Sequence, residues 1–355
     1  MAERFETLAA LLQHGFDTLI DVRSPAEYAE DHIPGAISLP VLNDAERAEI
    51  GTIYKQQSPF LARKHGAARV FRNAADHVEH RLMDRDGGWR PLVYCWRGGQ
   101  RSGSFTWMLG QIGWRAGMIA GGYRTYRRLV KRDLYDDPLP HRLIALAGYT
   151  GTAKTELLHR LAARGVQMLD LEGLAVHRGS LLGDMGEPQP GQKAFESRIA
   201  LELSALDAAR PVLVEAESSK IGNRIIPPSL WAAMRAAPRI EVTAPIGARA
   251  AYLARAYADV LSDADRLRER LRPLRAHRGS AVIEGWFALI AAGDRRALTQ
   301  ALMQQHYDPS YDKSRRAIGA PVAARIDAPG LEPAQLDQIA ARIEAAVAAM
   351  DLSPP

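Results

Sequence analysis

The only cysteine of this 355-residue chain, Cys95, lies in a segment whose composition could make it a nucleophile. It follows an apolar run at residues 91–93 and begins the loop C-W-R-G-G-Q-R, which contains Arg97 and Arg101. A strand that leads through a glycine-rich loop into a helix directs backbone N–H groups at one point, where they and the arginines would stabilise a thiolate or a bound oxyanion. We therefore predict a lowered pKa for Cys95, with Arg97 and Arg101 as its catalytic partners. The alternative is that Cys95 is a small buried apolar side chain.

A second candidate site is residues 148–155, which match the phosphate-loop pattern G-x-x-x-x-G-K-[ST] except that Ala153 replaces the glycine before the lysine. The segment lies between an apolar run and a predicted helix, where backbone N–H groups can hold phosphate while the lysine neutralises its charge. The predicted phosphate or diphosphate ligands are Gly148, Thr150, Gly151, Thr152, Lys154 and Thr155. A methyl group at position 153 crowds the approach of phosphate to the backbone, so the sequence leaves open whether the loop binds a nucleotide or only a diphosphate. A glycine-rich structural turn is the alternative.

Two carboxylates, Glu215 and Glu217, follow a strand predicted at residues 211–214. Ligands bind at the carboxyl ends of parallel strands, so Glu215 is the better candidate to hold a magnesium ion or its waters together with Thr155. Capping of the following segment explains Glu215 equally well.

Basic residues are concentrated in two segments, although the net charge is only +5. Such clusters neutralise backbone phosphates, which makes a nucleic acid a plausible partner. The candidate contacts are Arg124, Arg127, Arg128, Lys131 and Arg132 in the first segment and Arg268, Arg272 and Arg275 in the second. A solvated helix face is the alternative, because Asp263, Asp265 and Glu269 are interleaved with the second segment.

The elements that must position these groups alternate between strands and helices. Strands are expected at residues 18–22, 36–39, 91–94, 117–119, 143–147, 167–171, 211–214, 239–242 and 323–327. Helices are expected after Ser24 and at residues 44–81, 101–112, 156–164 and 333–350. This order predicts an α/β fold with parallel sheets. We expect a first domain at 1–130, a basic helix end and linker at 131–140, and a P-loop-like α/β domain with helical additions at 141–355.

Composition limits the expected cellular location of the protein and the kinds of site that its cysteine can form. No apolar run is long enough to cross a bilayer, and the first residues lack the basic and then apolar order of a secretory signal, so we expect a cytoplasmic protein with no membrane partner. A single cysteine excludes an intrachain disulfide and a cysteine-rich zinc site.

Three segments of the first domain resemble the rhodanese family of sulfur carriers. They are D-V-R-S-P-A-E-Y at residues 21–28, H-I-P-G-A-I at residues 32–37, and the loop at residues 95–101. The resemblance implies a rhodanese-like parallel-sheet domain at the N-terminus.

Four further segments extend the resemblance to nearly the whole chain, about residues 8–350. They are the degenerate phosphate loop, D-L-E-G-L-A-V-H-R-G-S at residues 170–180, E-S-S-K-I-G at residues 217–222 and H-Y-D at residues 306–308. Together with the first domain they are similar to the tRNA 2-selenouridine synthase family. Ala153 and Ser219, the latter where a basic residue is expected, depart from the family pattern.

The resemblance implies a transferase that acts on 2-thiouridine at the wobble position of certain tRNAs in two steps. Geranyl diphosphate alkylates the sulfur, and selenophosphate then replaces the thiogeranyl group. Cys95 is implied in selenium insertion and the phosphate loop in holding the prenyl diphosphate. No tightly bound cofactor is expected beside these co-substrates and magnesium. The implied partners are the tRNA anticodon arm and an enzyme that produces selenophosphate, and the oligomeric state stays open.

The same resemblance selects further polar groups for the second site: His177, Arg178, Ser180, His306 and Asp308. A capping or turn role is the alternative for the two histidines. Trp286, Phe287 and Leu289 are conceivable walls for the geranyl chain, although ordinary core packing explains them better.

Three rival functions remain open from the residues alone. The Cys95-to-Arg101 spacing also fits a cysteine phosphatase, although Tyr94 stands where such enzymes carry a histidine. A rhodanese-type sulfurtransferase with an ATP-binding regulatory module is the second rival. A non-enzymatic RNA-binding scaffold is the third.

Overall fold

The computed structural model describes residues 2–216, 218–318 and 321–350, and the side chains of all of these except 314–318. The chain forms two compact units. The first comprises residues 1–137 and 191–204, and the second comprises residues 138–190 and 205–355. The expected domain at 141–355 is therefore interrupted, because one helix within it packs in the first unit. Glu217, one of the two carboxylates after the predicted strand at 211–214, lies outside the described residues.

The first unit is built on a parallel five-stranded sheet in the order β1-β5-β4-β2-β3. Its strands are β1 (Ala2–Glu3), β2 (Thr18–Asp21), β3 (Ile37–Ser38), β4 (Pro91–Tyr94) and β5 (Gly117–Ile119). The four strands expected here are confirmed, and the edge strand β1 was not predicted. Every residue of β4 is buried, which explains why it reads as a continuous apolar run.

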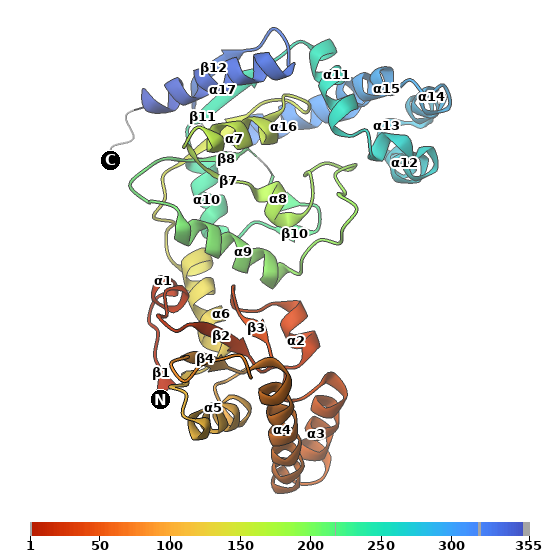
Figure 1. Cartoon of the computed structure of the whole chain (residues 1–355). Coiled ribbons are helices and arrows are strands. Elements are labelled where there is room, and N and C mark those ends of the chain that lie inside the picture. Colours follow the sequence, from red (N-terminus) through yellow and green to blue (C-terminus); the bar gives the residue numbers. More distant parts are fainter. Residues whose placement is uncertain (1, 217, 319–320, 351–355) are drawn as a thin grey trace. The chain divides into compact units, whose positions relative to one another are not determined.

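Helices surround this sheet. They are α1 (Leu8–Leu12), α2 (Pro25–Glu30), α3 (Asp44–Gln56), α4 (Pro59–Arg81), α5 (Gln100–Ile112) and α6 (Tyr123–Lys131), followed by a π-helical turn at Arg132–Asp136. The expected helical stretch at 44–81 is two helices, which pack against each other (Figure 1). The break between them occurs where Ser58 caps α4 and Pro59 occupies its first turn.

Helix α9 (Gln192–Ala205) joins the first unit through a network of buried polar groups. Asp31 is 3% exposed and accepts hydrogen bonds from the hydroxyl groups of Tyr123 (2.6 Å) and Ser197 (3.0 Å). Arg127 on α6 forms an ion pair with Glu196 of α9 and lies 3.6 Å from the Asp31 carboxylate. Buried charges persist only when they are paired, so this network fixes α9 against α6.

The second unit also has a parallel five-stranded sheet, in the order β12-β11-β6-β8-β7. Its strands are β6 (Leu143–Ala147), β7 (Gln167–Leu169), β8 (Val212–Glu215), β11 (Arg239–Thr243) and β12 (Val322–Asp327). All five expected strands are confirmed, and the predicted fold class is correct. The central strand β6, buried throughout, leads directly into the phosphate loop.

The helices of the second unit fall into two groups. Those that accompany the sheet are α7 (Lys154–Ala163), α8 (Leu171–Ala175), α10 (Pro228–Ala236), α11 (Ile246–Ala256) and α17 (Pro333–Ala348). A helical part follows α11 and comprises α12 (Ala264–Leu271), α13 (Arg275–Arg278), α14 (Ser280–Ala291), α15 (Arg295–Leu302), a π-helical segment (Met303–Tyr307) and α16 (Asp308–Ile318), with 3-10 turns at Val260–Ser262 and Arg272–Leu274. An unpredicted hairpin joins β9 (Lys220–Ile221) to β10 (Arg224–Ile225). Within the described ranges, no helix combines the length and the apolarity that a membrane crossing needs.

The network around α9 makes Arg127 a structural residue. We predict that Arg127→Ala lowers the free energy of unfolding of the first unit by about 3 kcal/mol, because Glu196 and Asp31 are left buried without their cation. The measurement is urea denaturation of the full chain, followed by tryptophan fluorescence. Arg128→Ala is the matched control: it removes an exposed neighbour on the same helix and should change stability by less than about 0.5 kcal/mol. Equal denaturation midpoints for the two variants would contradict the structural role of Arg127.

Candidate active sites

The loop that carries Cys95 connects β4 to α5 and is held against the start of α6 by close backbone contacts. Gly98 has a φ of +64°, and a Cβ there would lie 2.6 Å from the carbonyl oxygen of Ile119. A Cβ on Gly122, whose φ is +58°, would lie 2.2 Å from the carbonyl oxygen of Cys95. The Tyr123 N–H donates to that same oxygen at 2.8 Å. Both glycines are therefore required by steric contact as well as by backbone conformation.

The Cys95 thiol is 3% exposed but is surrounded by hydrogen-bond donors. The Ser102 hydroxyl donates to Sγ at 3.1 Å and the Gly99 N–H donates at 3.3 Å. Burial raises the pKa of Cys95, but the hydrogen bonds from Ser102 and Gly99 and the positive charge of Arg101 outweigh it, so the pKa lies below the ordinary thiol value. The predicted direction of the pKa is confirmed, while Cys95 also packs in the hydrophobic core of the first unit, as the alternative expected.

The two arginines of this loop occupy different environments. The Arg101 guanidinium forms an ion pair with Glu27 at 2.8 Å, and Arg47 contacts the same carboxylate at 3.1 Å. Burial raises the pKa of Glu27, but Arg101 and Arg47 outweigh it and hold the pKa below the usual range. Arg97 is exposed. An incoming oxyanion could therefore meet Arg97 directly, whereas Arg101 would have to be shared with Glu27.

The phosphate loop leads from β6 into α7 and is stabilised by its own backbone. Lys154 Nζ donates to the carbonyl oxygen of Gly148 at 3.2 Å, and the Thr152 hydroxyl donates to the carbonyl oxygen of Tyr149 at 2.8 Å. Ala153 takes a left-handed conformation with φ +60° at the start of α7 and belongs to the buried core of the second unit. A non-glycine residue in this conformation is uncommon, so the loop shape is imposed by its surroundings.

Arg249 and Asp308 form an ion pair that contacts the phosphate loop. The Arg249 guanidinium is buried, donates to the Thr150 carbonyl oxygen at 3.1 Å, and forms a two-point ion pair with Asp308 at 3.0 and 2.8 Å. The same guanidinium also lies over the aromatic ring of Tyr149, with Arg249 Cζ 5.1 Å from the ring centroid. Asp308, predicted for the second site, therefore orients the loop through Arg249.

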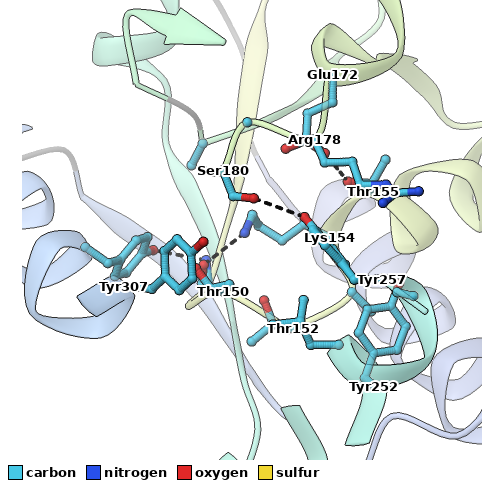
Figure 2. Close-up of a pocket in the computed structure, with 18 of the residues that line it drawn as sticks. Thr150, Thr152, Lys154, Thr155, Glu172, Arg178, Ser180, Tyr252, Tyr257 and Tyr307 are labelled. Atoms are coloured by element: carbon cyan, nitrogen blue, oxygen red, sulfur yellow. Dashed lines mark hydrogen bonds between the residues drawn. The ribbon is translucent and has the colours of Figure 1, made fainter. Parts of the chain in front are cut away.

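A cavity of about 510 Å³ opens over the phosphate loop (Figure 2). Of the predicted residues, it brings together Gly148, Thr150, Gly151, Thr152, Lys154, Thr155, Arg178 and Ser180. Glu215, His177, His306 and Asp308 are not among its lining residues. Arg178 pairs with Asp259 at 3.0 Å and lies over the ring of Tyr257.

The two predicted histidines have local partners. The Gly179 N–H donates to His177 Nδ1 at 3.1 Å, and Arg278 donates to His306 Nδ1 at 3.2 Å. Burial lowers the pKa of both histidines, and the charge of Arg278 lowers that of His306 further. Both are therefore neutral near pH 7, and His306 presents an acceptor to Arg278.

The carboxylate that accepts a hydrogen bond from the Thr155 hydroxyl belongs to Glu172. The Thr155 hydroxyl donates to Glu172 Oε2 at 2.9 Å at the edge of the cavity, whereas Glu215 is fully buried on β8. Within the described part of the chain, no three or more His, Cys, Asp or Glu side chains cluster to bind a metal by themselves. The hydroxyl and carboxylate fit the oxygen preference of Mg²⁺, which would share them with a bound diphosphate. Glu172 was not singled out from the sequence, although it lies in the quoted D-L-E segment.

Four tyrosines also line the cavity: Tyr307, which belongs to the quoted H-Y-D segment, and Tyr252, Tyr257 and Tyr311, which were not predicted. Ser180 and Tyr257 have their hydroxyl groups 3.5 Å apart (Figure 2), and the Gly148 N–H donates to the Tyr311 hydroxyl at 3.0 Å. Burial raises the pKa of Tyr257, and it raises the pKa of Tyr307 to about 12, so both remain neutral phenols. Only tertiary packing brings these rings together, which is why sequence spacing gave no signal.

The expected prenyl walls lie elsewhere. Trp286 is buried in the helical core, where its indole N–H donates to Gln305 at 2.7 Å. Phe287 and Leu289 pack against the same core, and none of the three lines the cavity. The alternative of ordinary core packing is thus confirmed.

Some of the candidate nucleic-acid contacts are exposed, and others are partly buried in ion pairs. The exposed residues are Arg124, Arg128, Lys131, Arg272 and Arg275. The other candidates, Arg127, Arg132 and Arg268, are partly buried and pair with carboxylates of their own unit. Arg275 is exposed but also pairs with Glu284. The exposed face of α6 is therefore better suited to contact phosphate than Arg127.

Comparison with known proteins gives a consistent result for both units. A family model described as "Rhodanese-like domain" matches residues 5–129, and one described as "tRNA 2-selenouridine synthase AAA domain" matches residues 141–278. The tRNA 2-selenouridine synthase of Nitrosomonas europaea is 35% identical over 262 residues, which cover 72% of this chain and 68% of that protein. That of Hahella chejuensis is 32% identical over 335 residues, which cover 82% of this chain and 84% of that protein.

The donors around Cys95 predict the pH at which its thiolate forms. Ser102→Ala removes the nearest donor, so the pKa should rise and the thiolate should appear at higher pH than in the original protein. The ultraviolet absorbance of the thiolate, titrated against pH, measures this without a second cysteine to confuse the signal. Ser104→Ala, on the same helix, is the matched control and should leave the midpoint in place. An unshifted midpoint in Ser102→Ala would show that this hydrogen bond does not stabilise the thiolate.

The Thr155–Glu172 pair predicts a magnesium-dependent affinity for diphosphate. Glu172→Gln should weaken binding of inorganic diphosphate about tenfold in the presence of Mg²⁺, because a carboxylate oxygen close to the ion is lost. Binding without Mg²⁺ should be unchanged or slightly tighter, since a negative charge has been removed. Calorimetric titration under both conditions makes the comparison, and an equal loss in both would argue against a metal at Glu172.

Proposed function

This chain belongs to the tRNA 2-selenouridine synthase family, and from that premise we propose that it replaces the sulfur of 2-thiouridine at the wobble position of tRNA with selenium. Geranyl diphosphate first alkylates the sulfur, and selenophosphate then displaces the thiogeranyl group. The observation that supports two steps is the presence of two glycine-bearing strand-to-helix loops whose side chains differ in chemistry. The first loop contains Cys95, whose pKa is lowered, and the second contains Lys154 and the hydrogen-bonded pair of Thr155 and Glu172.

The first step is assigned to the phosphate loop. The thiouridine sulfur attacks the allylic carbon of geranyl diphosphate, the carbon–oxygen bond breaks, and the electron pair leaves with the diphosphate. Lys154 and the N–H groups at the start of α7 stabilise that developing charge, and Mg²⁺ held near Thr155 and Glu172 would add electrostatic stabilisation. The mixed polar and apolar lining of the cavity suits an anion that carries an apolar chain.

The alkylation prepares the base for the second step. A thiocarbonyl carbon is a poor electrophile because sulfide is hard to expel, whereas an S-alkyl group leaves as a thiol. Selenium of selenophosphate adds to C2, the bond to the geranyl-bearing sulfur breaks, and the geranylthiolate takes up a proton. Water then cleaves the selenium–phosphorus bond and releases phosphate.

The Cys95 loop is assigned to selenophosphate. A tetrahedral oxyanion fits a turn that presents backbone N–H groups and Arg97, with Arg101 nearby. Cys95 is assigned to selenium insertion at this loop, where its lowered pKa keeps more of it as thiolate at neutral pH. An enzyme that makes selenophosphate would supply this donor in the cytoplasm.

The tRNA is proposed to be held mainly by exposed cations. Arg124, Arg128 and Lys131 are exposed on α6, the helix whose first residues contact the Cys95 loop. Their charges would contact backbone phosphates of the anticodon arm. Such contacts weaken steeply as salt rises, so binding of tRNA should be strongly salt-dependent.

The test is the mass of the wobble nucleoside after incubation of 2-thiouridine tRNA with each donor separately and with both. Geranyl diphosphate alone should add a ten-carbon chain, and both donors should yield 2-selenouridine. Cys95→Ala should retain geranylation but lose selenation, whereas Lys154→Ala should chiefly raise the concentration of geranyl diphosphate needed. Loss of both steps in Cys95→Ala would overturn the assignment of separate loops, and an unchanged apparent affinity in Lys154→Ala would remove the phosphate loop from the mechanism.

A further inference from the structure

A small apolar recess adjoins the cavity above the phosphate loop. Its volume is about 10 Å³, and five of its lining residues also line the larger cavity: Thr150, Ser180, Leu253, Tyr257 and Tyr307. The residues that line only the recess are Leu182, Leu261, Thr299 and Leu302. Thr150 belongs to the phosphate loop, so the recess begins where a bound diphosphate would end.

The recess presents little that could hydrogen-bond a ligand. Leu182, Leu261 and Leu302 are buried side chains of the helical core. The Thr299 hydroxyl already donates within the fold, with the carbonyl oxygen of Arg296 at 2.9 Å and that of Ala250 at 3.2 Å. A nucleotide base buried here would lose its hydrogen bonds to water without replacement, whereas a hydrocarbon would be stabilised by leaving water.

We propose that this recess receives the far end of an apolar chain whose diphosphate lies on the phosphate loop, and that Leu302 sets the maximum length of that chain. The identity of the chain as a prenyl group rests on the proposed function. The recess has room for about one water-sized group, which is enough for a terminal methyl group but not for a further five-carbon unit. A longer prenyl diphosphate would have to displace the Leu302 side chain, which is 1% exposed at the end of α15.

The decisive variant is Leu302→Ala, which truncates one of the side chains that line only the recess. Removing a buried leucine side chain can leave an apolar cavity of roughly 150 Å³ that accepts a benzene-sized ligand. The original protein should bind and transfer geranyl diphosphate in preference to farnesyl diphosphate. In Leu302→Ala the ratio of kcat/KM for farnesyl over geranyl transfer should rise at least tenfold, and the ratio of their affinities should rise in parallel.

Leu298→Ala is the matched control. Leu298 lies one turn earlier on α15, is equally buried in the same helical core, and lines neither cavity. It should lose comparable stability and leave the farnesyl-to-geranyl ratio unchanged. Leu253→Phe, which fills the junction of the two cavities, provides a test in the opposite direction and should favour the five-carbon dimethylallyl diphosphate over geranyl diphosphate.

The outcomes separate this inference from the function on which it rests. Absence of geranyl transfer and of geranyl diphosphate binding in the original protein would overturn the proposed function. Geranyl transfer with the same ratio in Leu302→Ala and Leu298→Ala would overturn the length-setting role alone. Equal affinity of the original protein for inorganic and geranyl diphosphate would show that the recess binds no chain.

Discussion

The second site depends on one buried cation. Arg249 donates to the Thr150 carbonyl oxygen, pairs at two points with Asp308, and lies over the ring of Tyr149. These contacts tie the phosphate loop to α11 and to the start of α16, the elements that also contribute tyrosines to the cavity. A buried guanidinium is tolerated only with such partners, so these contacts stabilise the loop and the two helices against one another.

The two units share one local arrangement of strand, turn and helix but place different side chains in it. In each, a fully buried parallel strand ends in a glycine-bearing turn, and the following helix directs its first N–H groups towards that turn. In the first unit the strand is followed by a cysteine whose charge is stabilised by Ser102 and Arg101. In the second unit the turn ends with a lysine and a threonine beside Glu172. The two turns thus share a backbone arrangement and differ in the side chains that follow it.

The parts that could be predicted from the sequence are those with a local cause. Strands β4, β5 and β6 were expected at their observed residues because buried parallel strands appear as apolar runs bounded by turns. The Cys95 turn and the phosphate loop were found because glycines and charges at fixed spacing follow such strands. Ala153 was read as an obstacle to phosphate, and the structure shows that it also occupies a left-handed position within the core.

The parts that could not be predicted depend on packing between distant segments. Tyr252, Tyr257 and Tyr311 share no spacing that indicates a cavity, and Glu172 is identified only by its contact with Thr155. Arg127 appeared to be one of several surface cations, because nothing in its neighbourhood shows that Glu196 will pair with it.

The packing of α9 in the first unit also determines where the chain could be cut into separate domains. The backbone leaves the first unit after residue 137, returns for residues 191–204, and leaves again. A fragment that stopped at Asp137 would contain every strand of the first sheet and Cys95, yet it would expose the face of α6 that Glu196 and Ser197 cover. Because residues 191–204 lie inside the stretch that otherwise forms the second unit, no single cut in the chain separates the two units intact.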